Sequence, residues 1–280
     1  MYLNQKNGII VVKVGTSTIT HPSGALNLRI IEDLSRVLSD IKNSGRKVVL
    51  VSSGAVSAGI SRLSLDHRPR TLEEKQALAA VGQSELMNIY SRFFAAYGHC
   101  VGQVLMTRDV VDFAMRRSSA ENTFSQLLMF NCIPIVNEND SVSSEEIREE
   151  ANYGANDTLS AYVAILAGAD LLVNLSDIDG LYDSDPKENP NARLISRVDI
   201  IDDRIMSLAG GAGTERGTGG MLTKLRAARL ATSAGIPMCI VNGSNPAVLY
   251  DIIDGKEPGT FFSAVKPEQE QIPSGTTVSN

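Results

Sequence analysis

Several residue types that identify common classes of protein are scarce in this chain. The three cysteines, Cys100, Cys132 and Cys239, lie far apart and form no CxxC pair. This spacing supports neither a disulfide framework nor a structural zinc site. Each cysteine falls in or beside an apolar segment, so we expect buried structural thiols. The three histidines are isolated from one another, so a histidine-centred catalytic triad has no local support.

Long charged and apolar runs are missing as well. The net charge is −6 and no run of Lys or Arg occurs, which argues against a nucleic-acid partner. No apolar run reaches the roughly 18 residues that a membrane span needs, and the first residues lack the apolar core of a signal peptide. With 280 residues, 43% of them hydrophobic, the chain can bury a substantial core. We expect a cytoplasmic enzyme or binding protein that has no membrane contact.

Two nucleotide-binding motifs are also missing. The sequence contains no GxxxxGK[ST] segment and no GxGxxG segment after a strand, which excludes a P-loop NTPase and the Rossmann fingerprint. A nucleotide would therefore have to bind in another manner.

The segments that are present alternate between buried strands and amphipathic helices. Continuous apolar runs predict strands buried on both faces, at 9–14, 47–52, 100–106, 133–137, 170–175 and 237–242, with a short last strand at 260–262. Helical patterns lie between them, the first capped by Asn27 and the next with capping-box spacing at Thr71 and Glu74. Further helices are expected to end near Asn131 and to cover 157–167, 201–209 and 246–253.

Such alternation predicts an α/β fold, a three-layer αβα sandwich with a mostly parallel central sheet. We expect one domain over residues 1–265, followed by a loose polar tail at 266–280. Residues 138–155 are polar and acidic and are expected to form an excursion, such as a hairpin, beyond the carboxyl end of a strand.

In open α/β sheets, ligands bind beyond the carboxyl ends of the strands. Lys13 interrupts an otherwise apolar strand and is followed by Gly15, where a backbone can approach a ligand closely. A buried ammonium is costly unless it is paired, so Lys13 either holds a phosphoryl group or serves as a structural ion pair or an edge residue. Similar polar segments follow other strands, at 52–55, 137–140 and 176–182. Each is weak alone, but their convergence predicts a ligand site.

The glycine-rich stretch from Gly217 to Lys224 opens directly into a helical pattern. The N-terminus of a helix exposes unpaired N–H groups and a positive dipole end, which together favour an anion. Lys224, one turn into the helix, could contact the same anion. Taken alone, such a stretch is more often an ordinary surface turn.

Taken together, these segments resemble the amino acid kinase superfamily, and within it the members that phosphorylate glutamate. The similarity spans nearly all of residues 8–262 and is carried by seven segments in the family's order. These are 12–17, 51–55, 79–83, 136–140, 156–161, 175–182 and 217–224.

The resemblance implies ATP-dependent phosphorylation of the γ-carboxylate of L-glutamate, as the first step of proline biosynthesis. It implies Mg²⁺ accompanying ATP, with no dedicated metal ligands in the protein, and it implies inhibition by free proline and a homo-oligomer, either a dimer or a tetramer. By position, Lys13 and Lys224 resemble catalytic lysines, and Asp157 resembles the aspartate that orients them. Substrate contacts are implied at Ser53, Gly54, Ala55, Asp140 and Asn156. ATP contacts are implied at Lys13, Gly15, Ser176, Asp177, Thr218, Gly219, Gly220, Met221, Leu222, Thr223 and Lys224.

Two departures from the family pattern stand out. Ala155 occupies a position where an aspartate is usual, which puts the strength of glutamate binding in doubt. The frequent C-terminal PUA domain is not expected either. Other functions therefore stay open: another amino acid kinase, acting on acetylglutamate or uridylate, or a non-catalytic protein that senses nucleotide or proline.

Overall fold

A computed structural model describes residues 8–107, 109–142, 155–209 and 219–265. The predicted excursion at 138–155 is therefore described only in part, and the predicted tail at 266–280 lies outside the described residues.

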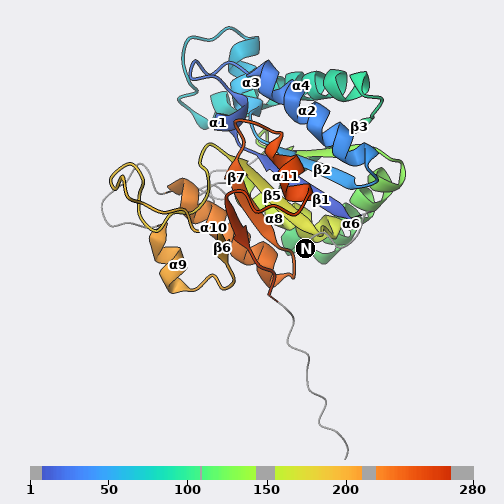
Figure 1. The fold of residues 1–280 in the computed structure, drawn as a ribbon. Helices are drawn as coiled ribbons and strands as arrows, with labels where there is room; N and C mark the ends of the chain where they lie inside the picture. Colours follow the sequence, from blue (N-terminus) through green and yellow to red (C-terminus); the bar gives the residue numbers. More distant parts are fainter. Residues whose placement is uncertain (1–7, 108, 143–154, 210–218, 266–280) are drawn as a thin grey trace, which may run out of the picture.

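A single sheet of eight strands runs through the middle of the described chain (Figure 1), in the order β3-β4-β2-β1-β5-β7-β8-β6. All of its described strand pairs are parallel except β7 with β8. The strands are β1 (Ile9–Val14), β2 (Lys47–Ser52), β3 (Val101–Met106), β4 (Ile133–Glu138), β5 (Leu171–Ser176), β6 (Arg197–Val198), β7 (Met238–Asn242) and β8 (Thr260–Phe262).

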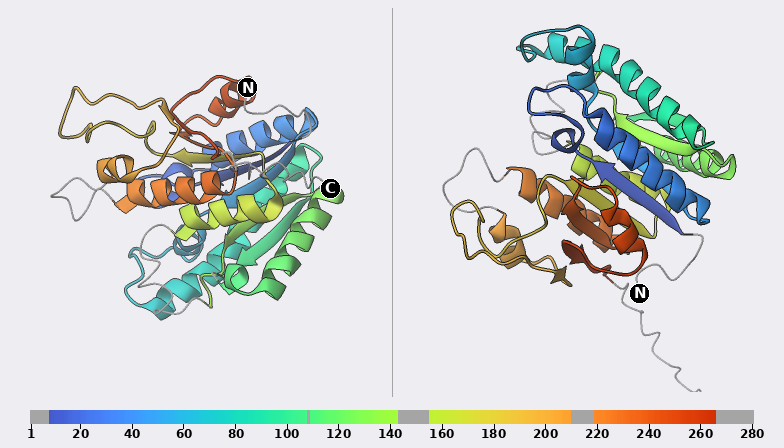
Figure 2. Two further views of the ribbon diagram at one scale, coloured as in Figure 1. Left: turned by 90° about the horizontal axis from the view of Figure 1, so that it is seen from below. Right: turned by 45° about the horizontal axis from the view of Figure 1, so that its top comes forward.

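Helices connect the strands and lie on both sides of the sheet (Figure 2). They are α1 (Thr16–Ile19), α2 (Leu28–Asn43), α3 (Ala55–Arg62), α4 (Leu72–Ala96), α5 (Asp109–Asp112), α6 (Ala114–Met129), α8 (Ala155–Ala167), α9 (Asp203–Leu208), α10 (Gly219–Ser233) and α11 (Val248–Ile253). The three-layer α/β architecture expected from the sequence is confirmed.

The two faces of the sheet carry separate hydrophobic cores. On one face, side chains of α2, α4 and α11 pack on alternate residues of the central strands, among them Val12 and Leu50. On the other face, α6, α8 and α10 pack on the intervening residues, among them Val11 and Val49. Because strand side chains alternate between faces, two such cores require continuous apolar strands, as the sequence has.

Local signals set several element boundaries as expected. Asn27 Oδ1 accepts from the backbone N–H of Ile30 at 3.3 Å, and Thr71 Oγ1 accepts from that of Glu74 at 3.2 Å, which caps α2 and α4. Behind α2, Gly45 has φ +102°, a left-handed conformation that favours glycine at the end of a helix.

Some predictions about smaller features are wrong or incomplete. Cys239 is buried, but Cys100 is exposed and Cys132 is half-buried. Both lie just before the outer strands β3 and β4, where less of the fold covers them. The two-residue strand β6 and the short helices α1 and α5 were not expected, because one turn of helix or two paired residues leave no readable periodicity.

Candidate active site

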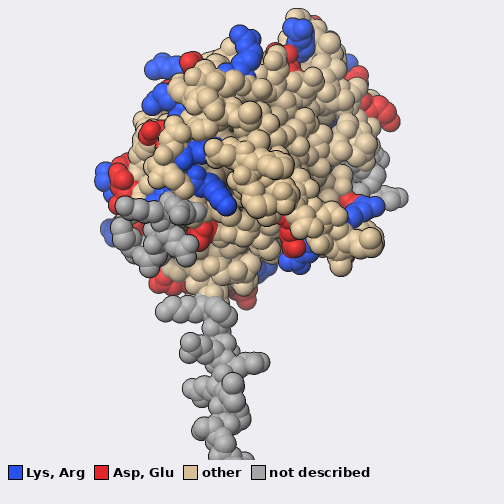
Figure 3. Space-filling model, turned by 90° about the vertical axis from the view of Figure 1, so that its right-hand side faces the viewer, with Lys and Arg blue, Asp and Glu red and all other residues tan. Residues whose placement is uncertain are grey.

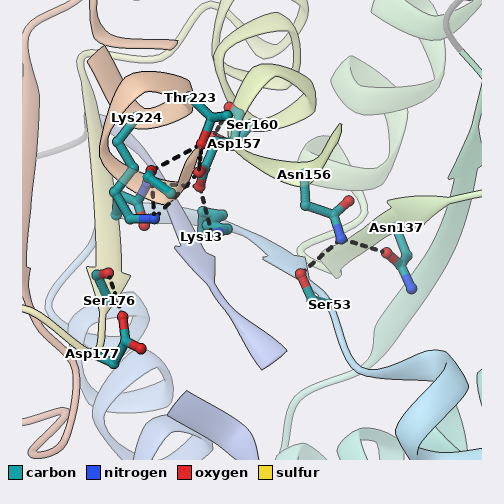
Figure 4. Close-up of polar contacts among 12 residues, drawn as sticks. Lys13, Ser53, Asn137, Asn156, Asp157, Ser160, Ser176, Asp177, Thr223 and Lys224 are labelled. Carbon is teal, nitrogen blue, oxygen red and sulfur yellow. Dashed lines mark hydrogen bonds and ion pairs between the residues drawn. The ribbon is translucent and has the colours of Figure 1, made fainter. Parts of the chain in front are cut away.

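Four of the predicted segments meet at the carboxyl ends of neighbouring strands. Lys13 lies near the end of β1, between β2 and β5 in the middle of the sheet, which excludes the edge position. Figure 4 shows the resulting cluster of polar contacts around Asp157 and, beside it, a second group around Asn156. The convergence expected from the sequence is therefore present in the fold.

Asp157, in the first turn of α8, bridges the two lysines. Its Oδ1 lies 2.6 Å from Lys13 Nζ and its Oδ2 lies 3.3 Å from Lys224 Nζ. Lys13 and Lys224 are 6% and 9% exposed, and Asp157 is 4% exposed. Two ammonium groups that are 211 positions apart in the numbering (224 minus 13) thus meet around one carboxylate.

Two further side chains hold this carboxylate in place. Thr223 Oγ1 donates to Asp157 Oδ2 at 2.8 Å, and Asn174 Nδ2 donates to Asp157 Oδ1 at 2.9 Å. All three side chains are buried. Each carboxylate oxygen therefore receives one lysine and one neutral donor, which fixes the plane of the carboxylate between the two cations.

The electrostatics of the cluster favour an incoming anion. Burial alone would raise the pKa of Asp157, but the attraction of Lys13 and Lys224 outweighs it and lowers that pKa to about 2. Burial lowers the pKa of Lys13, and Asp157 offsets this only in part because Lys224 adds repulsion. The lowered pKa values of Asp157 and Lys13 share one contribution, which is that two buried cations pair with the same carboxylate. A phosphate group would supply the missing negative charge.

The glycine-rich stretch forms the start of α10, although Gly217 and Thr218 lie outside the described residues. Lys224 Nζ also donates to the backbone oxygen of Gly220 at 3.2 Å, which draws the ammonium group back toward the helix start. Met221 and Leu222 pack against the core on the α8 and α10 side. Both side chains are only partly buried.

The end of β5 provides a second segment beside the lysines. Ser176 is buried there, and its hydroxyl donates to Asp177 Oδ1 at 3.2 Å. The carboxylate of Asp177 is close enough to Lys13 to raise the pKa of the lysine, although burial lowers the pKa of Lys13 more strongly. Gly15 approaches from β1, and a β-carbon there would lie 3.4 Å from Lys13 Nζ. Glycine at this position leaves space in front of the ammonium group.

The predicted substrate residues Ser53 and Asn156 are in direct contact. Asn156 Nδ2 donates to Ser53 Oγ at 2.7 Å and to Asn137 Oδ1 at 3.2 Å (Figure 4). Asn156 precedes Asp157 on α8, so the two groups of contacts are joined through adjacent residues of one helix. Asn156 Oδ1 is buried and has no hydrogen-bond partner among the described residues, which leaves an acceptor for a ligand.

Gly54 and Ala55 form the N-terminal end of α3. Gly54 has φ +103° and, within the described part of the chain, no side chain caps the helix. Its first N–H groups therefore keep their capacity to bind an anion. Asp140 lies nearby, lining a cavity of about 350 Å³ with Ala55 and Gln83, and Lys75 Nζ lies 3.9 Å from its Oδ1.

A larger cavity, about 750 Å³, lies between the start of α2 and the approach to α11. Its lining includes Arg29, Asp33 and Asn245 but none of the predicted site residues. The two lysines therefore do not line this larger cavity.

The sequence prediction missed two residues of this site, Asn174 and Gln83. It also did not foresee the side-chain contacts of Asn137. Asn174 is a polar residue inside the apolar strand β5, which is the same signal that singled out Lys13. Gln83 is a buried polar residue of α4 whose Oε1 accepts from Asn137 Nδ2 at 2.9 Å. Helical periodicity alone does not separate such a residue from solvent-exposed glutamines.

No group of three or more His, Cys, Asp or Glu side chains that could hold a metal ion occurs among the described residues. Mg²⁺ bound to a nucleotide needs no such group, because phosphate oxygens and water supply most of its ligands. The oxygens of Ser176 and Asp177, beside the lysines, suit the preference of Mg²⁺ for oxygen ligands.

On the face drawn in Figure 3, uncharged residues predominate and the described Lys and Arg residues form small separate groups rather than one basic patch. In the described ranges, no helix is long and apolar enough to cross a membrane.

Known proteins show the family to which this chain belongs. The family model described as "Amino acid kinase family" matches residues 8–242. A Clostridium perfringens protein named glutamate 5-kinase is 54% identical over 259 residues, covering 92% of this chain and 96% of that protein. A Listeria innocua protein of the same name is 52% identical over 259 residues, covering 92% and 94%. The chain belongs to the amino acid kinase family.

Solved structures with low sequence identity share the fold. The UMP kinase from Ureaplasma parvum superimposes with a TM-score of 0.60 at 16% identity, covering 92% of this chain and 99% of that one. The carbamate kinase from Giardia lamblia bound to AMP-PNP gives a TM-score of 0.63 at 14% identity, covering 92% and 98%. At these identities the likeness shows the fold alone.

Proposed function

We propose that this protein phosphorylates the γ-carboxylate of L-glutamate with ATP, forming glutamyl 5-phosphate and ADP as the first step of proline biosynthesis. The single observation that carries the chemistry is the bridge of Asp157 between Lys13 and Lys224. The acceptor is suggested by two relatives named glutamate 5-kinase, each more than 50% identical over 92% of the chain.

Phosphoryl transfer asks the protein mainly for positioning and for charge stabilisation. A γ-carboxylate oxygen attacks the γ-phosphorus of ATP, a new P–O bond forms, and the bond to the β-phosphate oxygen breaks, releasing ADP. In this proposal Lys13 and Lys224 contact the migrating group, and Asp157, which pairs with both, holds the two ammonium groups in position. The carboxylate of glutamate is ionised near neutral pH, so no general base is required.

In this proposal, ATP and glutamate bind on opposite sides of β1, at the carboxyl ends of the strands. Ser176, Asp177 and the first turn of α10 bind ATP, together with Gly15 and Thr218. Ser53, Gly54, Ala55, Asp140 and Asn156 bind glutamate. The N–H groups of α3 suit its α-carboxylate, and the carboxylate of Asp140 suits its ammonium group.

Mg²⁺ accompanies ATP, and when bound it draws negative charge from the phosphate oxygens. Ser176 and Asp177 are the side chains of this chain that would face the ion. An acyl phosphate hydrolyses readily in water, so the reaction needs a segment that excludes water. The candidate from the sequence, residues 138–155, lies outside the described residues at 143–154.

Three properties extend the proposal: a cytoplasmic location, where ATP is available, inhibition by free proline, and a homo-oligomeric state. Addition of proline to the assay and light scattering of the purified protein test the last two. A monomeric protein would still be expected to phosphorylate glutamate with the same substrate preference. The oligomeric state is therefore tested separately from the reaction.

Hydroxylamine trapping tests the reaction directly. With L-glutamate, ATP and Mg²⁺, the purified protein should yield a hydroxamate, because hydroxylamine captures the acyl phosphate. N-acetylglutamate and UMP, assayed by ADP release, separate this function from that of other family members. A protein that releases no ADP with any of the three acceptors is not a kinase of this kind.

A further inference from the structure

Helix α4 touches the proposed acceptor site at two adjacent residues, Gly82 and Gln83. Both are buried, in the middle of a helix that extends from Leu72 to Ala96. Their contacts reach α3 and β4, the two elements that carry the acceptor side of the site.

Gly82 is in backbone contact with the start of α3. A β-carbon at Gly82 would overlap the carbonyl oxygen of Ala55 and the backbone nitrogen of Gly59. A β-carbon at Gly59 would likewise overlap the carbonyl oxygen of Leu78 on α4. At these two glycines the backbones of α3 and α4 are in direct contact, with no side chain between them. This contact fixes the position of Ala55, the first residue of α3, and so the position of the free N–H groups at the start of that helix.

Gln83 begins a chain of side-chain amides that all point the same way. Its Oε1 accepts from Asn137 Nδ2 at 2.9 Å, which turns Asn137 Oδ1 toward Asn156. Asn137 Oδ1 then accepts from the backbone N–H of Glu138 at 2.9 Å and from Asn156 Nδ2 at 3.2 Å. Asn156 Nδ2 also donates to Ser53 Oγ at 2.7 Å.

A side-chain amide has a donor end and an acceptor end, so each link in this chain sets the orientation of the next. Without an acceptor at position 83, Asn137 Nδ2 loses its partner, and only the backbone N–H of Glu138 still holds the amide in this orientation. A reversed Asn137, with its NH₂ group facing the NH₂ group of Asn156, then becomes more populated. Asn156 would then have to reverse. The acceptor Asn156 Oδ1, which lacks a partner in the described part of the chain, would no longer be the atom offered to a ligand.

We infer that Gly82 and Gln83 are positioning residues for the acceptor substrate, acting through Ala55 and through the Asn137–Asn156 pair. The inference rests on the proposed function, since it takes glutamate as the ligand of Ser53 and Asn156. Neither residue touches the phosphate side of the site. Their loss therefore affects the binding of glutamate far more than the binding of ATP.

Two substitutions at position 83 test the amide chain. Gln83→Met keeps the length of the side chain but removes the acceptor, whereas Gln83→Glu keeps an oxygen acceptor whether or not it is protonated. We expect Gln83→Met to raise the KM for glutamate about tenfold, as expected for one buried hydrogen bond, and to leave the KM for ATP within about twofold. We expect Gln83→Glu to recover most of the loss.

Matched controls separate this effect from a loss of packing. Thr232→Val removes a buried hydroxyl on α10, and Gln126→Met makes the same chemical change on the exposed surface of α6. Both should leave the KM for glutamate unchanged. Equal rises of both KM values in Gln83→Met, or a KM for glutamate like that of the wild type, would overturn the role of Gln83.

Gly82→Ala tests the helix crossing. The added methyl group must push α3 away, so the KM for glutamate should rise at least as much as in Gln83→Met while the protein still binds ATP. ATP binding by calorimetry shows whether the variant is folded, and an unchanged KM for glutamate overturns the role of Gly82. An active wild type with unaffected variants contradicts this inference alone. A wild type that neither binds nor phosphorylates glutamate contradicts the proposed function as well.

Discussion

Lys13 and Asn174 lie opposite each other on neighbouring strands β1 and β5, and both donate to the same oxygen, Oδ1 of Asp157. The parallel register fixes this pairing through the backbone. The lysine contributes charge, and the amide limits the directions in which the carboxylate can turn. The site therefore includes a neutral residue that can be tested independently of the charged ones.

Asn174→Leu should reduce kcat by about 2- to 10-fold, which corresponds to the net contribution of one hydrogen bond. The substitution keeps the volume of the side chain similar and removes an amide oxygen that has no partner among the described residues. Stability should change little for that reason. Steady-state kinetics and thermal unfolding measure the two effects. A loss as large as that from removing a lysine would mean that Asn174 acts directly on the reactants.

Lys224→Ala should lower kcat at least about 100-fold, the scale reported for removing one preorganised contact to developing charge. The control is Lys187→Ala, since Lys187 is an exposed lysine in the turn after β5. Both variants are compared with the wild type in the hydroxamate assay. Near wild-type turnover in Lys224→Ala would remove this residue from the proposed mechanism.

Asp140→Ala should raise the KM for glutamate and leave the KM for ATP nearly unchanged. Asp140 lines the cavity beside Ala55 and Gln83, away from the start of α10. Asp112→Ala, at the exposed end of α5, is the matched control. If the KM for ATP rises instead, Asp140 has been placed on the wrong side of the site.

The stability of the protein should depend on the ionisation of Asp157 at acid pH. Folding lowers the pKa of Asp157 from 3.8 to about 2, so the unfolded chain binds this proton more readily. The stabilisation is complete above the unfolded value and is lost as the pH falls toward the folded value, about 2 kcal/mol in all. Urea unfolding of the wild type and of Asp157→Asn should show a difference in free energy that shrinks with acidification. A difference independent of pH contradicts this account.

The activity should fall on the alkaline side at a pH below the ordinary lysine pKa of 10.5. Burial lowers the pKa of Lys13, and kcat/KM reports ionisations of the free enzyme. The profile of kcat/KM for ATP should therefore show an alkaline decrease within this range. Lys13→Arg retains its charge there, so its profile, although lower throughout, should lack the decrease. A wild-type profile that stays flat up to pH 10.5 would contradict a lowered pKa of Lys13.

Much of this site could be predicted because the strands are continuous apolar runs that end in polar residues. Lys13 was conspicuous inside such a run, and the rule that ligands lie beyond the carboxyl ends of parallel strands brought together segments that are distant in sequence. The family resemblance then assigned roles that the fold is compatible with. The structure brings Lys13, Asp157 and Lys224 into contact, and their roles stay a prediction.

The contacts between the predicted residues could not be read in the same way. Asn174, Asn137 and Gln83 act through hydrogen bonds that depend on strand order and on the crossing of two helices, and no local pattern encodes either. The exposure of Cys100 has a similar origin, since its neighbouring strand β3 is at the edge of the sheet. Pairing order is a property of the whole chain, whereas periodicity is a property of a short window.

The central position of β1 divides the molecule into two halves by reactant. Contacts proposed for the acceptor come from residues 53–156, and those proposed for the nucleotide come mainly from residues 176–224, on the far side of β1 in the sheet. Recombination within this family could therefore replace the first half and alter which molecule is phosphorylated, while the inherited second half continues to recognise the same nucleotide. Chimeric chains joined at α8 offer a direct route to new acceptor preferences.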